Sequence, residues 1–393
     1  MSKVLFVNGN LYGHLNPTLP VVAELIKRGE EVWYFCSKLF EDKIGATGAH
    51  FIDSGENLEK FLANYKPTGN HPFYALLEYI IKYDCAMLPE LIDKVKKIQF
   101  DYVIYDSILG AGCFLKAIMK VPIICSNSSF AMSKLPVPDR MMQPGFHPQL
   151  DEFYEALQSA CREWNVKISS GYELFINKGD MNLVYTSKEF NSEGEYFDDS
   201  YKFVGPSIKE GNEIVEFPFE KIEGEKVVYI SLGTINTDFN NFYKMCITAL
   251  GDLNFKVVMS VGKKCDINLL GEIPDNFIVC NFAPQLEILK NKTSVFISHG
   301  GFNSVSEALY YGVPIITIPM VNDQYMVAKR LVNIGAGIAL QMNEISEFEI
   351  KESVLKILSD SKYKDASERI GKSFHLAGGY EKAVDYILEF VKG

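Results

Sequence analysis

The sequence predicts an α/β protein with two domains, each built around a parallel, doubly wound β-sheet. Short apolar runs alternate with segments of helical period, and strands that alternate with helices of about 10–15 residues indicate parallel sheets. The alternation stops near residue 207 and restarts near residue 226. A chain of 393 residues is also too long for one typical core, so two domains of about 150–200 residues are expected.

The first half opens with a strand, a turn and a helix. Lys3–Val7 is a continuous apolar strand pattern, and the loop that follows it contains His14. Asn16 and Pro17 fit the N-cap and the first position of a helix, because Asn accepts from free N–H groups and Pro has no N–H to lose. Glu31–Cys36 is the next strand, which completes a β–α–β unit.

The same order recurs later in this half. Tyr102–Tyr105 is a strand that ends at Asp106, and a turn containing Gly follows it. An apolar helix near Cys113–Met119 then leads to a strand at Pro122–Cys125. Asp106 is therefore expected at the carboxyl end of a strand.

Two less regular segments of the first half are rich in large apolar side chains. Residues 56–98 have a helical pattern with many aromatic side chains, and residues 127–176 combine aromatic residues and Met with several prolines. Such insertions are where an apolar pocket can be built, although most of their aromatic residues are expected simply to cover the sheet. The candidate pocket residues are Phe73, Phe130, Met132, Met142 and Phe146.

The second half repeats the pattern after residues 208–225, whose acidic and Gly-containing sequence indicates a linker. A strand near 226–232 leads through Gly233-Thr234 to a helix near 239–250. Further strands are expected near 256–261, 277–280, 295–298 and 314–318, and further helices near 324–334, 347–358 and 381–391. We assign 1–207 to the first domain, 226–375 to the second, and 376–393 to a C-terminal helix that could pack back on the first domain.

The stretch from Phe282 to Gln324 predicts an anion site. Ser294–Ser298 is a short buried-strand pattern, Gly300-Gly301 permits a tight turn, and Asn303–Tyr311 has helical spacing. A strand, a glycine turn and a helix start direct the free N–H groups of the first helical turn, and the positive end of the helix dipole, toward a bound anion. Donor side chains at the same turn are supplied by His299, Asn303 and Ser304. We interpret this stretch as a diphosphate-binding site.

Ligands of open parallel sheets bind outside the carboxyl ends of the strands. The polar residues that directly follow predicted strands are His14, Asp106, Thr234, His299 and Asp323. If the two sheet edges face each other, these five residues lie around a cleft between the domains. That arrangement is expected of an enzyme with two substrates.

The composition excludes several classes of protein. The net charge of −11, from 39 basic and 50 acidic residues, and the lack of a basic stripe argue against a nucleic-acid partner. The eight cysteines are scattered without a C-x-x-C pair, so we expect free thiols rather than disulfides or a zinc site. The N-terminus is too briefly apolar for a signal peptide, and no segment approaches the about 18–20 apolar residues that span a bilayer. We expect a soluble, cytoplasmic protein.

The motifs of the second half are specific as a combination. Pro284-Gln285 precedes H-G-G-x-N-S-x-x-E, which runs from His299 to Glu307, and G-V-P and P-x-x-x-D-Q follow up to Gln324. In the first half, G-H-L-N-P stands at Gly13–Pro17. With these motifs the chain resembles, over nearly its whole length, the UDP-glycosyltransferase family in its bacterial, macrolide-glycosyltransferase-like branch. The resemblance implies the GT-B fold, in which two Rossmann-like domains face each other across a cleft.

The resemblance implies a donor, a UDP-sugar, and roles for the residues at its phosphates. His299 would hydrogen-bond the α-phosphate. Asn303, Ser304 and the backbone at Gly301 would share the diphosphate. Thr234, in S-L-G-T, would approach the same phosphates.

For the nucleoside, the resemblance implies that Glu307 accepts from the ribose hydroxyls, which favours UDP over dTDP. Phe282 would stack on the uracil, while Ala283 and Gln285 hold its edge or the ribose. Plant members of the family have Trp at this place and again where Phe302 stands, so Phe282 offers a smaller stacking face.

For the sugar, the resemblance implies hydrogen bonds from Asp323 and Gln324 to its hydroxyls. These two residues also fit the N-cap of the following helix, and both roles are compatible. The pair fits glucose, and the sequence leaves galactose and N-acetylglucosamine open.

The chemistry that the resemblance implies begins with the acceptor hydroxyl, which loses a proton as it attacks the anomeric carbon. His14 would take this proton, since histidine has a reference pKa of about 6.5. Asp106 would orient the ring and stabilise the imidazolium. Such general-base assistance contributes about 10²–10⁴-fold. The sequence shows no carboxylate cluster for a metal ion, so neither a metal nor a cofactor is expected, and one displacement on an α-linked donor gives a β-linked product.

The leading hypothesis is an inverting transferase that moves a hexose onto a hydroxyl of a hydrophobic small molecule such as a macrolide, a flavonoid or another phenolic. A sugar-nucleotide epimerase on the same architecture would have a small polar pocket instead of the aromatic segments. A non-catalytic UDP-sugar-binding or regulatory protein would not need His14. A glycolipid transferase would need a basic amphipathic helix to dock on a membrane, and none is found. The sequence assigns no oligomeric state.

Overall fold

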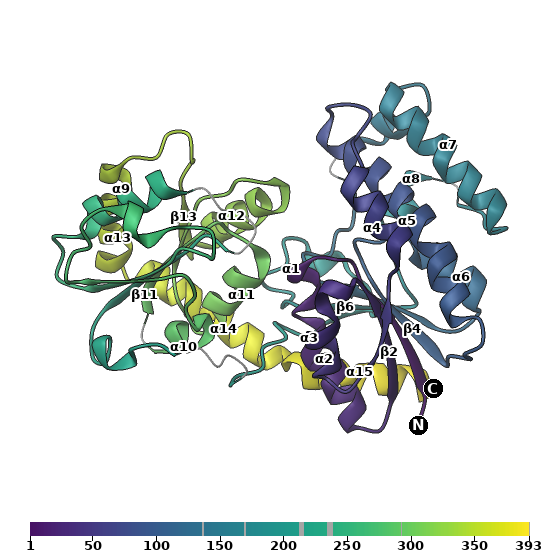
Figure 1. Cartoon of the computed structure of the whole chain (residues 1–393), viewed down its shortest axis with the longest axis horizontal. Coiled ribbons are helices and arrows are strands. Elements are labelled where there is room, and N and C mark those ends of the chain that lie inside the picture. The colour runs from purple at the N-terminus through teal and green to yellow at the C-terminus, as the bar shows by residue number, and fades with distance from the viewer. Residues whose placement is uncertain (136, 169, 212–215, 234–238, 292, 393) are drawn as a thin grey trace. The chain divides into compact units, whose positions relative to one another are not determined.

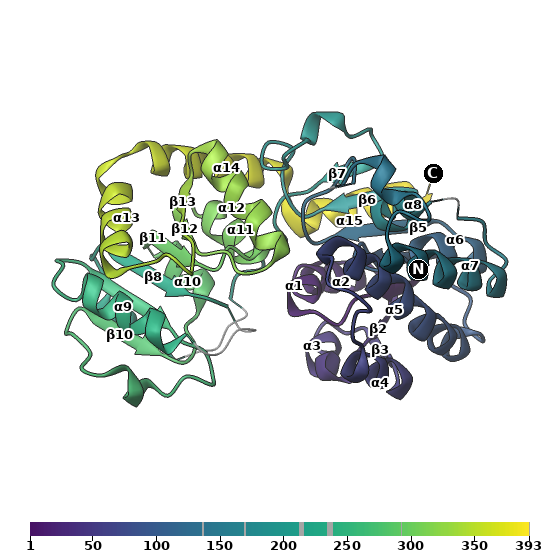
Figure 2. The same cartoon turned by 90° about the horizontal axis from the view of Figure 1, so that it is seen from above.

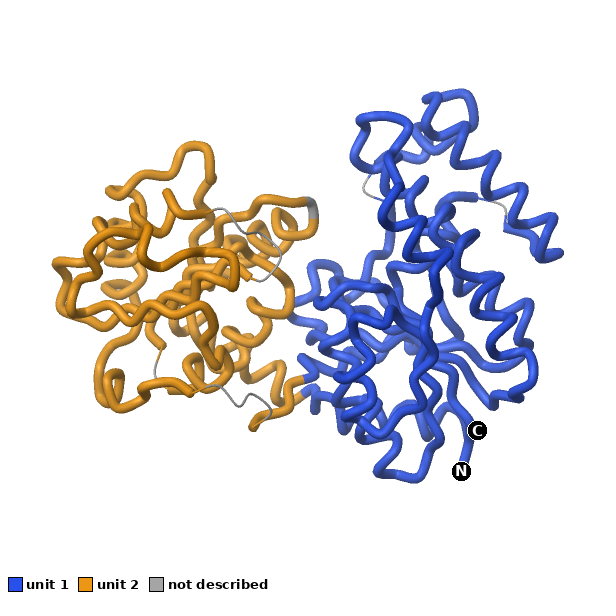
Figure 3. Tube along the Cα trace, in the orientation of Figure 1, with its two compact units in different colours: residues 1–207, 377–393 blue, residues 208–376 orange. Residues whose placement is uncertain are grey.

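The computed structural model of the protein describes residues 1–135, 137–168, 170–211, 216–233, 239–291 and 293–392, apart from the side chain of residue 322. The chain divides into two compact units (Figure 3). Unit 1 consists of Met1–Ser207 and Ala377–Gly393, and unit 2 consists of Ile208–Leu376. Residues 208–225, which the sequence suggested as a linker, are grouped with unit 2.

The described part of unit 1 contains a seven-stranded sheet in the order β3-β2-β1-β4-β5-β6-β7, and all its strand pairs are parallel. Its strands are β1 (Lys3–Val7), β2 (Glu31–Cys36), β3 (His50–Asp53), β4 (Tyr102–Asp106), β5 (Ile123–Asn127), β6 (Met181–Val184) and β7 (Tyr201–Phe203). The order runs outward from β1 in both directions, which confirms the predicted doubly wound sheet and brings the carboxyl ends of β1 and β4 together. Sequence patterns missed β3, β6 and β7, which have four, four and three residues.

Helices cover both faces of this sheet (Figure 1). They are α1 (Tyr12–Leu15), α2 (Thr18–Lys27), α3 (Glu41–Gly45), α4 (Glu56–Asn64), α5 (Pro72–Val95), α6 (Gly112–Met119), α7 (Pro148–Glu163), α8 (Gly171–Ile176) and α15 (Gly379–Lys392), with short 3₁₀ turns at Lys38–Phe40, Asp139–Met142 and Gly194–Tyr196. Successive side chains of a strand point to opposite faces. Leu5 and Val7 of β1 therefore pack with residues of α5 and α6, whereas Val4 and Phe6 pack with residues of α2 and α15.

Helices α5 and α7 pack against each other and begin in the same way. The Nδ1 atoms of His71 and His147 accept from backbone N–H groups of the first helical turns, and a Pro follows each histidine. Both histidine rings lie against Tyr74, with ring centroids 4.2 and 5.0 Å apart. Residues 127–176 are therefore more regular than expected, because Pro148 begins a helix, where its missing N–H costs nothing.

The start of α2 differs from the prediction. Asn16 and Pro17 were expected to begin this helix, but Asn16 is the C-cap of the one-turn helix α1 and Pro17 is the N-cap of α2. The loop after β1 folds into α1 because its backbone closes a helical turn, with the N–H of Asn16 donating to the Tyr12 carbonyl at 3.0 Å. His14 consequently lies on a short helix and not in an open loop.

The described part of unit 2 contains a six-stranded sheet in the order β10-β9-β8-β11-β12-β13, again with parallel pairs. Its strands are β8 (Val227–Ser231), β9 (Lys256–Ser260), β10 (Phe277–Cys280), β11 (Thr293–Ser298), β12 (Ile315–Thr317) and β13 (Gly337–Ala339). Its helices are α9 (Asn240–Leu250), α10 (Gln285–Lys290), α11 (Phe302–Tyr310), α12 (Asn322–Ile334), α13 (Glu347–Ser359) and α14 (Lys362–Ala377), with 3₁₀ turns at Phe219–Lys221 and Ile267–Leu270. Figure 2 shows α9 and α13 on one face of this sheet and α11 and α12 on the other. The prediction of a second parallel α/β sheet is confirmed.

The sequence patterns of unit 2 missed β13 and α14. Strand β13 has only three residues. Helix α14 has a strongly polar sequence, K-Y-K-D-A-S-E-R-I-G-K-S-F-H-L-A, in which Tyr363, Ile370 and Phe374 are the large apolar side chains that it buries. Three large apolar side chains over 16 residues give too sparse a hydrophobic pattern to indicate a helix.

The C-terminal helix α15 packs on α2 within unit 1. Ala383, Val384 and Ile387 are fully buried in the core that includes β1 and α2. An ion pair between Arg28 and Asp385 joins the two helices at their exposed side, with 2.5 Å between nitrogen and oxygen. The end of the chain thus completes the core of the unit in which the chain begins.

Replacement of Ile387 by Ala is expected to lower the free energy of unfolding of unit 1 by about 2–5 kcal/mol. The reason is that the side chain is fully buried and its removal leaves a cavity. Chemical denaturation measures the change, and Glu389→Ala at an exposed position of the same helix is the control, with an expected change within about 0.5 kcal/mol. Equal stabilities of the two variants would contradict the packing of α15 on the sheet.

Within the described residues, we find no helix that has both the length and the hydropathy required to cross a membrane. All eight cysteines are free thiols.

Candidate functional site

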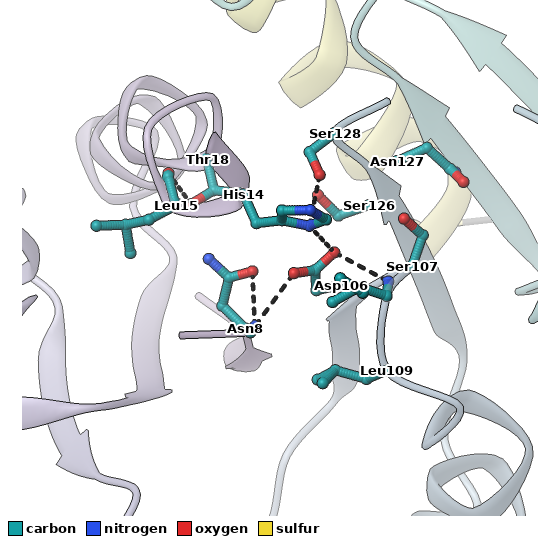
Figure 4. A network of polar contacts seen from close by, with 12 residues as sticks. Asn8, His14, Leu15, Thr18, Asp106, Ser107, Leu109, Ser126, Asn127 and Ser128 are labelled. Atoms are coloured by element: carbon teal, nitrogen blue, oxygen red, sulfur yellow. Dashed lines mark hydrogen bonds and ion pairs between the residues drawn. The ribbon is translucent and has the colours of Figure 1, made fainter. Parts of the chain in front are cut away.

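In unit 1, the side chains of His14 and Asp106 meet at the carboxyl edge of the sheet (Figure 4). The His14 Nδ1 atom lies 2.9 Å from Asp106 Oδ1. Asp106 ends β4 and is 1% exposed, whereas the side chain of His14 on α1 is 20% exposed. A buried carboxylate thus holds one side of the imidazole, and the ring itself is partly accessible.

The Asp106 carboxylate also holds the surrounding backbone. Its Oδ1 accepts from the N–H of Ile108 at 3.2 Å, which is the turn-capping role common for an Asp after a strand. Its Oδ2 accepts from the N–H of Gly9 at 3.1 Å. A Cβ at position 9 would lie 2.9 Å from this Oδ2, so glycine is what lets the two strand ends approach. Asp106 therefore caps its own turn and contacts His14 at the same time.

Ser128 is a third polar side chain at this point, and sequence reasoning missed it. It directly follows β5, is buried, and its Oγ lies 2.7 Å from His14 Nδ1. Nδ1 has one proton to share, and the carboxylate is the stronger acceptor. We assign the proton to Nδ1, directed at Asp106 with Ser128 Oγ as a second acceptor, and the lone pair to Nε2. The sequence feature that could have pointed to Ser128 is N-S-S at residues 127–129, at the end of β5, the strand that pairs with β4.

In unit 2, His299 follows β11 in a turn made by two glycines. Gly300 has φ +84°, a conformation that favours glycine. A Cβ at position 301 would lie 2.4 Å from His299 Nε2, and one at Gly233 would lie 2.8 Å from its Cε1. The imidazole therefore occupies the space that side chains at positions 233 and 301 would fill. Its orientation depends on both glycines.

The environment of His299 favours the neutral ring. Burial lowers its pKa to about 4, and the nearby Asp323 carboxylate opposes this only in part. A neutral imidazole carries one N–H donor and one acceptor nitrogen at pH 7. Gly301 is the N-cap of α11 and makes no side-chain capping bond, so the N-terminal end of this helix, where its dipole is positive, follows His299 directly in the chain. These are the groups for which the sequence predicted an anion site.

Three candidate donor-site residues are brought together at the other side of α11. Gln285 starts α10, and its Nε2 donates to Glu307 Oε2 at 2.5 Å and to Ser304 Oγ at 3.3 Å. The hydroxyl of Tyr229 lies 3.4 Å from Gln285 Oε1. Glu307 and Ser304 are separated by one turn of α11, so a single amide can contact both. The sequence resemblance assigned neighbouring parts of one ligand to these residues, and here they contact one another.

Phe282 is 40% exposed on the segment that leads to α10, and Ala283 beside it is half-buried. The Lys263 ammonium lies 5.4 Å from the Phe282 ring centroid, a cation–π contact that sequence reasoning did not identify. Asn281 holds the loop of Lys263 in place, because its Nδ2 donates to the carbonyls of Gly262 and Cys265 at 2.8 and 3.0 Å. Phe302, which stands where plant members of the family have Trp, is buried in the first turn of α11.

The last two donor candidates lie in the first turn of α12. Asp323 is exposed, and Gln324 is buried with its Oε1 accepting from the N–H groups of Met320 and Val321 at 2.9 and 3.2 Å. Neither residue is the N-cap, which is Val321. Gln324 therefore stabilises the entry to the helix with its oxygen and can meet a ligand only through its amide nitrogen. Thr234 lies outside the described residues.

The five apolar candidates of unit 1 lie in different surroundings. Met142 is buried on the wall of a cavity of about 1060 Å³ beside α7, and Met132 lines a separate cavity of about 380 Å³. Phe130 is buried against Phe190, with ring centroids 5.4 Å apart, and Phe73 contacts Phe175 at 5.3 Å. Phe146 is exposed. The packing of α5, α7 and α8 sets the directions of these side chains, and the sequence pattern could not predict that packing.

In the described part of the chain, His, Cys, Asp and Glu side chains form no group of three or more that could hold a metal ion. The titratable candidate residues instead form two pairs. His14 contacts Asp106 in unit 1, and His299 lies near Asp323 in unit 2. They can act on protons and anions.

Comparison with known proteins shows the family of the chain. The family model described as UDP-glucoronosyl and UDP-glucosyl transferase matches residues 211–377. Uncharacterized UDP-glucosyltransferase YojK of Bacillus subtilis (strain 168) is 34% identical over 398 residues, which cover 100% of this chain and 98% of that protein. This chain belongs to the UDP-glycosyltransferase family. The resemblance predicted from the motifs is thereby confirmed, and the protein is a glycosyltransferase.

This UDP-glycosyltransferase is also similar to two proteins named after natural products. Oleandomycin glycosyltransferase of Streptomyces antibioticus is 28% identical over 385 residues, covering 96% of this chain and 88% of that protein. The solved structure of CalG4, the calicheamicin glycosyltransferase, aligns with a TM-score of 0.85 and 23% identity, covering 100% of this chain and 98% of that chain. The structural similarity establishes the fold, two Rossmann-like domains of the GT-B type.

Proposed function

We propose that this UDP-glycosyltransferase transfers a hexose, with glucose as the first candidate, from a UDP-sugar to a hydroxyl of a hydrophobic small molecule, with inversion at the anomeric carbon. The observation that carries the proposal is the His14–Asp106 pair, in which a buried carboxylate lies 2.9 Å from Nδ1. This contact fixes the tautomer with its lone pair on Nε2, which is the form that a general base requires.

In the proposed reaction, Nε2 of His14 takes the proton of the acceptor hydroxyl while its oxygen forms a bond to the anomeric carbon. The bond between that carbon and the diphosphate oxygen breaks, and UDP leaves with the electron pair. Asp106 stabilises the imidazolium that forms, since its carboxylate contacts Nδ1 directly. One displacement converts an α-linked donor into a β-linked product, and no metal or cofactor takes part.

The donor is assigned to the residues around α11 and α12 of unit 2. The neutral ring of His299 and the N–H groups at Gly301, Asn303 and Ser304 stabilise the charge that develops on the leaving diphosphate. Glu307 would accept from the ribose hydroxyls once Gln285 releases it. Phe282 and Ala283 would border the base, Asp323 and the amide nitrogen of Gln324 would contact the sugar, and Thr234 would contribute as the resemblance implies.

The acceptor class is proposed from the names of the relatives. Oleandomycin glycosyltransferase carries the name of a natural product, which supports natural products such as macrolides as first acceptors to test, with phenolic compounds beside them. Unit 1 also provides large apolar side chains near its cavities, with Met132 and Met142 on their walls. The remaining candidates for acceptor contact are Phe73, Phe130 and Phe146.

Mass spectrometry tests this proposal most directly. The protein is incubated with UDP-glucose and a panel of macrolide and phenolic acceptors, and a mass increase of one hexose on an acceptor is expected. UDP binding without any hexose-bearing product would favour a non-catalytic UDP-sugar-binding protein. Conversion of UDP-N-acetylglucosamine to its epimer without an acceptor would favour the epimerase alternative, which none of the relatives named above supports.

The lowered pKa of His299, to about 4, predicts a pH dependence of donor binding. A diphosphate beside the ring favours the imidazolium and raises this pKa, so binding is coupled to proton uptake. The wild-type affinity for UDP, divided by that of His299→Asn, is therefore expected to rise as the pH falls from 7 toward 5. Isothermal titration calorimetry measures both proteins, and the ratio removes the titration of UDP itself. A ratio independent of pH would contradict contact between His299 and the phosphates.

The lowered pKa of His299 also makes the stability of the folded protein depend on pH. Between about pH 6.5, the ordinary value for histidine, and pH 4, the unfolded chain binds a proton that the folded His299 does not. Stability in this window therefore decreases as the pH falls. The calorimetric comparison is valid only at pH values where both proteins are shown to be folded.

A further inference from the structure

The helix that carries His14 has little stability of its own. Helix α1 has four residues, Tyr12–Leu15, and no side chain caps its N-terminus. A single helical turn fixes several backbone angles for few hydrogen bonds and does not persist unaided in water. The position of His14 therefore depends on contacts that hold the two ends of the segment from Asn8 to Thr18.

A buried tyrosine of the neighbouring strand makes these contacts. Tyr34 of β2 is fully buried, stacked on Phe6 with ring centroids 4.7 Å apart. Its hydroxyl lies 2.7 Å from Asn8 Nδ2, which donates to it, and 2.7 Å from Thr18 Oγ1. Asn8 directly follows β1 and precedes α1, whereas Thr18 begins α2, the helix after α1. One hydroxyl thus joins the residues on either side of α1.

The direction of each hydrogen bond in this chain can be assigned. The Thr18 hydroxyl donates its only proton to the carbonyl of Leu15 at 2.7 Å, the last residue of α1 (Figure 4). Tyr34 must then donate to Thr18, because Asn8 Nδ2 can only donate to Tyr34. Burial raises the pKa of Tyr34 well above its ordinary value, so its proton is present at any pH at which the protein is used.

The other end of the chain reaches the carboxylate that contacts His14. Asn8 Oδ1 accepts from the N–H of Gly9 at 3.1 Å, and the same N–H lies 3.1 Å from Asp106 Oδ2. Asp106 Oδ1 in turn contacts His14 Nδ1 at 2.9 Å. Hydrogen bonds therefore form a closed path that starts at Asp106, passes through Asn8, Tyr34 and Thr18 to the end of α1, and returns through the His14 side chain.

We propose that Tyr34 is a positioning residue for His14: its hydroxyl fixes the ends of the Asn8–Thr18 segment, so that the imidazole meets both Asp106 and the acceptor hydroxyl in one geometry. This inference rests on the proposed role of His14 as the base. Tyr34 touches no substrate in this assignment. It acts through Thr18 and α1 on one side and through Asn8 and Asp106 on the other.

The test compares Tyr34→Phe and Thr18→Val, which break the path at adjacent links, with Tyr102→Phe as the matched control. Tyr102 is also fully buried in the same sheet, but its hydroxyl lies 3.4 Å from Glu30, at the amino end of β4. Each of the two test variants is expected to lower kcat about tenfold to a hundredfold, because small displacements of a catalytic group have large effects on rate. The KM for the UDP-sugar is expected to change less than about twofold, since its proposed residues lie in unit 2.

Three further readouts separate positioning from general destabilisation. The double variant should be no slower than the slower single variant, because both changes break one path. Thr18→Ser, which keeps the hydroxyl, should retain most of the activity. The pH profile of kcat/KM should change in Tyr34→Phe and stay unchanged in Tyr102→Phe, although both lose a buried hydroxyl and are expected to melt at lower temperature.

The outcomes distinguish this inference from the proposed function. If His14→Ala is inactive while a folded Tyr34→Phe and Thr18→Val both turn over like the wild type, the positioning role is wrong and the base assignment stands. If His14→Ala itself stays active, the base assignment is wrong and with it the reason for a positioning residue. Should Tyr34→Phe fail to fold, Thr18→Val and Thr18→Ser decide the question, since full activity of Thr18→Val overturns the role.

Discussion

Replacement of His14 by Ala is expected to lower kcat by about 10²–10⁴-fold, the usual contribution of general-base catalysis, and to leave the affinity for UDP nearly unchanged. The reason is that the proposed base contacts Asp106 and Ser128, whereas the proposed donor residues belong to unit 2. Initial rates with a saturating UDP-sugar give kcat, and calorimetry gives the UDP affinity. Loss of both together would show that the variant has lost its fold or that His14 has a different role.

Two companion variants sharpen this experiment. His50→Ala removes an exposed histidine of β3 and is the control, with an expected rate equal to that of the wild type. Asp106→Asn keeps the shape of the partner but offers Nδ1 an amide as well as a carbonyl, so the tautomer with its lone pair on Nε2 is no longer enforced. A large fall in kcat is expected here too. Wild-type turnover by His14→Ala would exclude it as the base.

The sequence predicted the parts of the fold that local pattern controls. Lys3–Val7 is a continuous apolar run with a β–α–β order after it, and it lies inside the first sheet, between β2 and β4. Strand β7, with three residues, carries too little pattern of its own and exists because β6 offers it a partner. Helix α1 was missed for the same reason, since a single turn depends on contacts with Thr18 and not on its own composition.

The candidate site also contains residues that the sequence pattern could place and residues that it could not. His14 and Asp106 were predicted to approach each other because both follow strands of one parallel sheet, and the structure brings them to 2.9 Å. Ser128 lies at the next strand end by the same rule, but a serine after a strand is too common to stand out. The apolar candidates such as Met132 and Met142 follow no such rule. They lie in segments whose side-chain directions are set by tertiary packing, and they line different cavities.

Replacement of Gly301 by Ala is expected to weaken UDP binding as strongly as His299→Ala does. A Cβ at position 301 would lie 2.4 Å from His299 Nε2, so the ring must leave the place from which it would donate to the phosphates. Loss of a hydrogen bond to a charged group costs about 1.5–3 kcal/mol, which corresponds to about tenfold to a hundredfold in affinity. Gly45→Ala is the control, because a Cβ there meets nothing within 4 Å.

The double variant Gly301→Ala/His299→Ala distinguishes steric displacement of the ring from damage to the turn. Removing the imidazole removes the atom that the new Cβ would meet, so the double variant is expected to regain much of the stability that Gly301→Ala loses. Its UDP affinity should stay at the level of His299→Ala, because no donor has returned. Thermal melting and calorimetry on the three proteins measure the two effects separately. If the double variant recovers neither, the backbone at position 301 itself needs glycine, and the contact of Gly301 with the ring is not what makes a side chain unacceptable there.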